Sequence, residues 1–204
     1  MNKLLVSVSL LVSASLPAAF SAGDAVAQGQ AKSHAHAHPA AAAAAAAPAT
    51  DEAMVASAMT AAPEAVARNA TVIAVGKDGA VRTVRKGTGA FTCMADNPAT
   101  PGPDPMCMDA NALEWASAWM KRQTPPQKTG FMYMLAGGTD ASNTDPHAAA
   151  PTAGNHWIST GPHVMVVGAP EMLKHYPTAA DPDTSQPYVM WAGTPYAHLM
   201  IPVR

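Results

Sequence analysis

The feature that most restricts the fold is a proline-rich segment between the chain's two cysteines, Cys93 and Cys107. Prolines occupy positions 98, 101, 103 and 105. Because proline has no backbone N–H and clashes with a preceding helical turn, this segment cannot form a helix and offers few donors to a sheet. Cysteines at this spacing favour a structural disulfide over a metal-binding or reactive pair. We therefore predict a Cys93–Cys107 bridge that closes an irregular loop.

The first 27 residues have the pattern of a secretory signal peptide. Lys3 precedes an apolar run over residues 4–20, and Ala25-Val26-Ala27 forms an A-x-A cleavage site. The run is too short and too rich in Ser and Ala to remain as a spanning helix, and no other stretch approaches spanning length. We therefore expect a periplasmic or secreted protein that begins near Gln28 and has no membrane span.

Residues 28–50 are low in complexity. His34, His36 and His38 alternate with alanine, and an alanine run follows over 40–47. Such a segment has too few large apolar side chains to offset its ordering entropy, so we interpret it as a tether. His-rich tracts also capture transition metals loosely. The remaining residues, 51–204, are expected to form a single domain.

Short apolar runs separated by turn residues dominate this domain. The Asp78-Gly79 step predicts a hairpin between the first two strands, and Asp109 is a suitable N-cap for the longest helix. We expect an α+β fold, with a mainly antiparallel sheet, a few short helices and one disulfide. The expected helices span 51–62, 63–70, 110–122 and 171–176, and the expected strands 71–75, 81–85, 90–94, 130–136, 156–159, 164–168, 189–192 and 198–203.

Charge argues against a nucleic-acid partner. The chain has 12 Lys and Arg against 14 Asp and Glu, and only 13% of its residues are charged. A nucleic-acid-binding protein would show a basic stripe, and the nearest equivalent, Arg82, Arg85 and Lys86, is expected to be a solvated hairpin edge. The polar loop over 137–146 lacks the spacing of an EF-hand and is expected to form turns instead.

The most informative pattern is a repeated His-x-Met step on two late strands. His163 and Met165 on one strand, and His198 and Met200 on the other, are each two residues apart, so each pair leaves the same face of its strand. If the two strands were neighbours, two imidazoles and two thioethers would converge. Imidazole with soft sulfur suits copper, particularly Cu(I), so the pattern predicts a copper or other soft-metal module. Met132 or Met134 would complete the site.

Three other interpretations stay open. Methionine also fills irregular cores, and the chain has 13 methionines, so these residues are also explained by packing alone. A second interpretation is a metal-free domain that binds a small molecule or a protein. A third is a hydrolase-like enzyme in which His163 or His198 acts as a base, with Tyr196 or Asp145 nearby. No G-x-S-x-G, H-E-x-x-H or phosphate-binding glycine loop accompanies them.

Several short strings are similar to those of one protein group. They lie at residues 62–64 (Ala-Pro-Glu), 91–94 (Phe-Thr-Cys-Met), 104–107 (Asp-Pro-Met-Cys), 142–146 (Ser-Asn-Thr-Asp-Pro), 160–165 (Thr-Gly-Pro-His-Val-Met) and 193–198 (Gly-Thr-Pro-Tyr-Ala-His). Together they resemble a group of uncharacterised exported proteins of Gram-negative bacteria. The likeness covers residues 59–204. It implies export from a Gram-negative cell, and it implies no activity or cofactor.

Overall fold

The structure is a computed structural model that describes residues 50–203, except 77–78, 99 and 101. The predicted signal peptide (1–27) and the predicted tether, apart from Thr50, lie outside these described residues. The chain divides after Ala42 into two units, and every described residue belongs to the second. Within the described part, no helix has the length and apolar character needed to cross a membrane.

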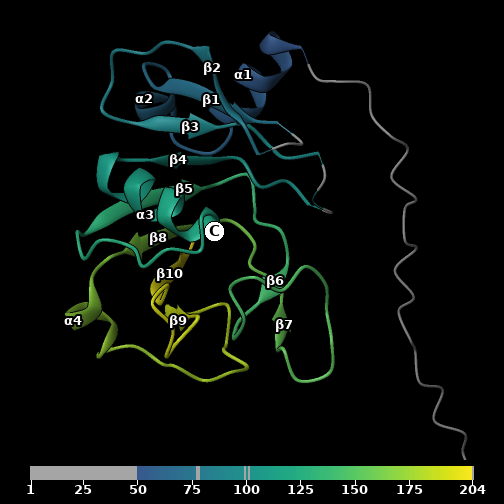
Figure 1. Cartoon of the computed structure of the whole chain (residues 1–204), viewed down its shortest axis with the longest axis vertical. Helices are drawn as coiled ribbons and strands as arrows, with labels where there is room; N and C mark the ends of the chain where they lie inside the picture. Colours follow the sequence, from purple (N-terminus) through teal and green to yellow (C-terminus); the bar gives the residue numbers. More distant parts are fainter. Residues whose placement is uncertain (1–49, 77–78, 99, 101, 204) are drawn as a thin grey trace, which may run out of the picture. The chain divides into compact units, whose positions relative to one another are not determined.

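An eight-stranded sheet organises this unit, in the order β2-β1-β3-β4-β5-β8-β10-β9, with a separate two-stranded ribbon β6-β7 (Figure 1). All neighbouring strands are antiparallel except β1 and β3. The predicted α+β class is therefore confirmed. The elements are α1 (Asp51–Met59), α2 (Glu64–Ala67), β1 (Thr71–Val75), β2 (Val81–Arg85), β3 (Thr92–Met94), β4 (Met106–Met108), α3 (Ala110–Met120), β5 (Gly130–Met134), β6 (Ala141–Ser142), β7 (Trp157–Ile158), β8 (His163–Val167), α4 (Pro170–Leu173), β9 (Tyr188–Met190) and β10 (His198–Pro202).

The disulfide links two adjacent strands. Cys93 in β3 faces Cys107 in β4 directly, the two Cα atoms lie 3.9 Å apart, and the predicted bridge is formed. Strand β4 was not expected from the sequence, because it directly follows the proline-rich loop. The strand forms because the three residues after Pro105 all keep their N–H groups and can pair with β3 on one side and β5 on the other.

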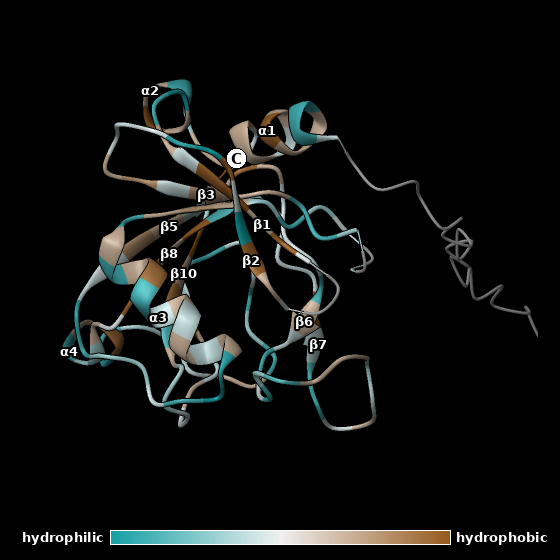
Figure 2. Ribbon diagram, turned by 45° about the horizontal axis from the view of Figure 1, so that its top comes forward, coloured by the Kyte–Doolittle hydropathy of each residue, from teal (hydrophilic) through white to brown (hydrophobic). Residues whose placement is uncertain are grey.

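Two hydrophobic cores lie on opposite faces of the sheet. Successive strand residues point to opposite faces, so Cys107 belongs to one core and Met108 to the other. The Cys107 face is covered by the alanine-rich helices α1 and α2 over β1 and β3, and the Met108 face carries α3 (Figures 1 and 2). In Figure 2, hydrophobic residues are prominent along the central strands, and α3 carries hydrophobic and hydrophilic residues in alternating bands.

Helix α3 is fixed against β5 by two devices. The Asp109 carboxylate caps the helix by accepting from Ala112 N at 2.8 Å, and its other oxygen accepts from Phe131 N in β5 at 3.0 Å. Gly130 makes the close approach possible, because a Cβ there would lie 2.9 Å from the Ala112 Cα. The sequence therefore sets both the start of α3 and its distance from the sheet.

Arg85 was expected to lie on a solvated hairpin edge, but its guanidinium is hydrogen-bonded to the chain near α2. Its guanidinium donates to the carbonyl oxygens of Ala67 and Ala70, each at 3.1 Å, at the C-terminal end of α2. Arg82 pairs with Asp51 at 2.5 Å, on the first turn of α1. Both arginines thus tie the hairpin to the two N-terminal helices.

Candidate functional site

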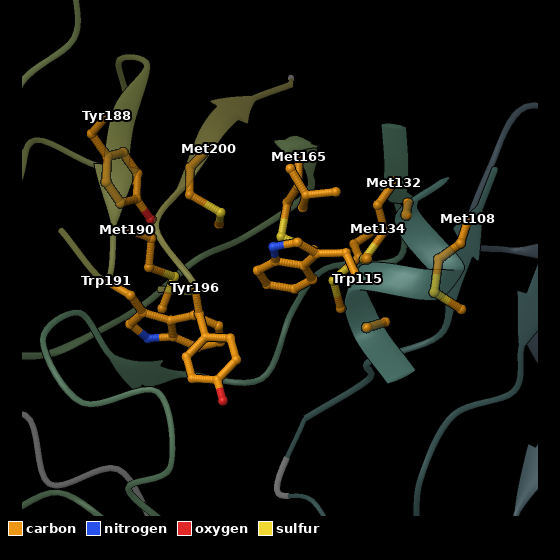
Figure 3. Packing of buried hydrophobic residues seen from close by; sticks show 13 residues of the cluster. Met108, Trp115, Met132, Met134, Met165, Tyr188, Met190, Trp191, Tyr196 and Met200 are labelled. Carbon is orange, nitrogen blue, oxygen red and sulfur yellow. The ribbon is translucent and has the colours of Figure 1, made fainter. Parts of the chain in front are cut away.

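A row of methionines crosses the middle of the sheet on the face that carries α3. Met108 faces Met132, Met132 faces Met165, and Met165 faces Met200, so the row runs over β4, β5, β8 and β10. Figure 3 shows these side chains leaving their strands on the side where the rings of Trp115, Trp191 and Tyr196 lie. Directly opposite residues in a sheet have Cβ atoms about 4.5–5.5 Å apart, so their side chains touch.

Above this row lies a cavity of about 470 Å³, which we call the methionine-lined cavity. The strands β4, β5, β8, β9 and β10 form its floor, α3 covers it, and the loop after β5 forms a wall. The methionine, tryptophan and histidine side chains that line it are Met106, Met132, Met134, Met165, Met190, Met200, Trp115, Trp119, Trp157, Trp191, His163 and His198. All four residues predicted to bind metal line this one cavity.

The two imidazoles are held in the same way. The Nδ1 atom of His163 lies 2.7 Å from the Gly161 carbonyl oxygen, and that of His198 lies 2.9 Å from the Tyr196 carbonyl oxygen. A carbonyl oxygen only accepts, so Nδ1 carries the proton and donates in both rings. Each neutral ring therefore keeps its lone pair on Nε2. In His198 this Nε2 is fully buried and has no hydrogen-bond partner among the described residues.

Burial keeps both rings neutral. The pKa of His198 is lowered to about 4, because burial disfavours the charged ring. The bond to Tyr196 opposes this effect, and the charge of His163 adds to it. The pKa of His163 also lies below the usual 6.5 because of burial, against a smaller opposing effect of the Gly161 bond. At neutral pH, each Nε2 therefore carries a free lone pair that can bind a metal ion or accept a hydrogen bond, and burial disfavours its protonation.

The sheet brings the two thioethers together more closely than the two imidazoles. Met165 and Met200 are directly opposite each other, as the neighbouring strands require. His163 faces Pro202, and His198 lies four residues before Pro202 on the same strand, because β8 and β10 are antiparallel. At about 3.3 Å per residue, the backbones of the two histidines are about 13 Å apart along the strands. The backbone alone therefore does not place all four predicted ligands around one point.

Aromatic rings fix the orientation of His198. The Trp191 ring centre lies 4.9 Å from that of His198 and the Trp115 centre 5.4 Å, both nearly edge-on. Trp119 stacks on Trp191 at 5.6 Å. Because these large side chains leave the imidazole no room to rotate, Nε2 is held in one position.

The cavity wall is acidic. Of the described residues that line the cavity, three are aspartates, Asp104, Asp140 and Asp145, and none is lysine or arginine. The pKa of Asp104 is raised to about 6, mainly by burial and further by Asp96, against hydrogen bonds from Asn97 and Thr100 that lower it. Asp96 and Asp104 also share a hydrogen bond, from Asp104 N to an Asp96 oxygen at 2.7 Å. This charge pattern favours a cationic occupant over an anionic one.

The polar loop over 137–146 was expected to form turns. It does so after Ser142, but Ala141–Ser142 form strand β6, which pairs with β7 and was not expected. The Ser142 hydroxyl oxygen accepts from Asp145 N at 2.8 Å, and an Asp145 oxygen accepts from His147 N at 2.9 Å. The loop is then fastened over the cavity by two indoles. Trp191 donates to the Ser142 carbonyl oxygen at 2.8 Å, and Trp119 donates to that of Pro146 at 3.0 Å. The loop oxygens are thus committed to structure.

The described residues contain no group of three or more His, Cys, Asp or Glu side chains arranged to hold a metal ion. A metal site formed by these residues would therefore have to include thioether ligands. For catalysis, the hydrogen bonds that His163 and His198 make in the described part of the chain go to carbonyl oxygens and not to a hydroxyl or carboxylate. Among the described residues, neither ring makes the hydrogen bond to a hydroxyl or thiol by which a histidine activates a nucleophile.

Comparisons with known proteins add nothing to this picture: no protein-family profile, curated protein or solved structure matches the chain.

Sequence reasoning selected four residues that line this one cavity, and it missed their surroundings. Met190 faces His198 directly, Trp115 and Trp191 clamp it, and Asp104 joins the wall from the proline-rich loop. The neighbouring Met190 and Trp191 were visible as a pair, but their role depends on β9 lying beside β10. Nothing in the sequence near Asp104 indicates that its loop reaches the cavity.

Proposed function

We propose that this chain is a soft-metal binding module that holds Cu(I) in the methionine-lined cavity. The observation that carries the proposal is the unpartnered, fully buried Nε2 of His198 beside thioethers. Met190 lies directly across the ladder from His198, and Met200 lies two residues along the same strand on the same face. An imidazole with two thioethers is a donor set that selects Cu(I) among the ions available to proteins.

The surroundings support a cation in two further ways. The hydrogen bond from Nδ1 to Tyr196 has the geometry of the outer-shell bond that orients metal-binding imidazoles. The aspartates on the cavity wall offset a positive charge that would otherwise be buried without compensation. The oriented imidazole and the aspartates together lower the free energy of a bound cation, and they do not lower that of a bound anion.

Anaerobic titration of the purified, untagged protein with Cu(I), in competition with a chromophoric Cu(I) chelator, tests the proposal. We expect His198→Leu to weaken binding by more than the about 10- to 100-fold that losing an outer-shell partner costs. The matched control is His175→Leu, because His175 is exposed and does not line the cavity. If His198→Leu bound as many Cu(I) ions as the wild-type chain with the same affinities, or if the wild-type chain bound no Cu(I), the proposal would be contradicted.

A second candidate is a small organic cation, which the size of the cavity favours. A volume of about 470 Å³ is large for an ion and falls in the range of about 300–1,000 Å³ typical of small-molecule pockets. The aromatic rings around Trp191 are of the kind that bind ammonium groups. A thermal-shift series with organic ammonium compounds distinguishes the two candidates. Stabilisation by such compounds, with no Cu(I) binding, would support this second candidate.

We also propose that the protein works in the periplasm or outside the cell. The Cys93–Cys107 bridge supports this location, because disulfides persist in oxidising compartments. The signal-peptide pattern of residues 1–27 supports it independently. The mature chain should therefore begin near Gln28 and carry both cysteines oxidised.

A further inference from the structure

His163 and His198 occupy equivalent positions in the sheet. In each ring Nδ1 donates to the carbonyl two residues earlier. Each histidine directly faces a methionine on its outer neighbouring strand, since His163 is opposite Met134 and His198 is opposite Met190. Each is also followed two residues later by a second methionine on the same face.

The antiparallel pairing of β8 and β10 relates these two sets by an approximate two-fold axis. The axis passes between Met165 and Met200, because these residues face each other directly. Rotation about it carries His163 onto His198 and Met134 onto Met190. The His-x-Met repeat of the sequence therefore corresponds to two equivalent positions in the sheet. The two histidine backbones lie at opposite ends of the paired strands, and both imidazoles line the one cavity.

This geometry points to two soft-metal centres in each chain. We propose that the cavity binds two Cu(I) ions, and that each ion is bound by one of the two imidazoles. The inference rests on the proposed function and extends it to a second site. One centre takes His163 with Met134 and Met165, and the other takes His198 with Met190 and Met200. The backbones of the two histidines are about 13 Å apart along the strands, whereas each histidine directly faces one methionine of its own centre and lies two residues from the other.

Charge on the cavity wall is compatible with two monovalent ions. The three aspartates that line the cavity carry more negative charge than one Cu(I) would neutralise. Nothing of opposite sign competes with the ions, because no lysine or arginine is found among the described lining residues. A second cation therefore adds less repulsion than it would in a neutral cavity.

The stoichiometry of Cu(I) binding tests the inference. We expect about two equivalents in the wild-type chain, one in His163→Leu, one in His198→Leu and none in the double variant. X-ray absorption of the loaded protein should show nitrogen and sulfur ligands and no short copper–copper path. One equivalent in the wild-type chain, removed by either substitution, would overturn the two-site inference and leave the proposed function standing. No binding by the wild-type chain would overturn both.

Methionine-to-leucine variants test the same inference with less risk of unfolding the protein than the histidine variants. Met134→Leu and Met190→Leu keep the side-chain volume and remove one thioether from one proposed centre each. We expect each to weaken one of two Cu(I) affinities and to leave the other unchanged. The matched control is Met172→Leu, because Met172 lies in α4, is 40% exposed and does not line the cavity. Equal weakening of both ions by either cavity variant would show that the donors act as a single site.

Discussion

Acid should destabilise the metal-free protein through His198. The side chain is 1% exposed, and its pKa is lowered from 6.5 to about 4, so the folded chain resists a proton that the unfolded chain accepts. A group of this kind contributes stability above pH 6.5 and loses it as the pH falls toward 4. At about 1.4 kcal/mol for each pH unit of that interval, the free energy of unfolding should fall by about 3 kcal/mol.

Urea unfolding followed by tryptophan fluorescence, at pH 7.5 and pH 4 with a chelator present, measures this loss. We expect His198→Leu to lose about 3 kcal/mol less than the wild-type chain over the same interval. Asp104, whose pKa is raised to about 6, has the opposite effect, since its folded form gains a proton first and stabilises the fold as the pH falls. Both proteins keep Asp104 and His163, so the difference between them isolates His198. Equal acid sensitivity in the variant and the wild-type chain would refute the reasoning.

Two further predictions concern the packing of α3 and the processing of the exported chain. Gly130→Ala should lower the free energy of unfolding by about 1–3 kcal/mol, because its Cβ would collide with the backbone of Ala112 and push α3 away from β5. Gly102→Ala is the control, expected within about 0.5 kcal/mol of wild type, since its Cβ would come no closer than 3.7 Å to another residue. In exported protein, N-terminal sequencing should begin near Gln28, and Cys93 and Cys107 should resist alkylation until reduced. If the exported protein kept residues 4–20, the predicted cleavage would be wrong. If the thiols reacted without prior reduction, the disulfide would be wrong.

Local sequence signals were sufficient for most of the secondary structure. The Asp-Gly turn predicted the β1–β2 hairpin, Asp109 predicted the start of α3, and short apolar runs between turn residues predicted β5, β8 and β10. Strand β4 was missed because proline density outweighed the three residues Met106–Met108, which pair normally. The parallel pairing of β1 with β3 was missed as well, because the two short runs do not show that these strands, which are separated by β2 in the chain, become neighbours.

The candidate site was less predictable, because it depends on which strands are neighbours. The spacing of His163 and Met165 shows that both side chains leave one face, and the same holds for His198 and Met200. Only the register shows that the methionines face each other and that the histidines lie at opposite ends. The cover of α3 and the tryptophan clamp require contacts between residues far apart in the chain.

Packing alone explains the methionines but not the histidines. Methionine fills a core as well as leucine does, with no need of a ligand. An imidazole whose Nε2 is buried without a partner, as in His198, costs about 1–3 kcal/mol that an apolar residue of similar size would avoid. The same face carries a second buried imidazole, His163, with its Nδ1 held in the same way. Nothing among the described residues offsets the penalty at Nε2 of His198. The metal ion of the proposed function would offset it, and the surrounding thioethers would favour a soft ion such as Cu(I).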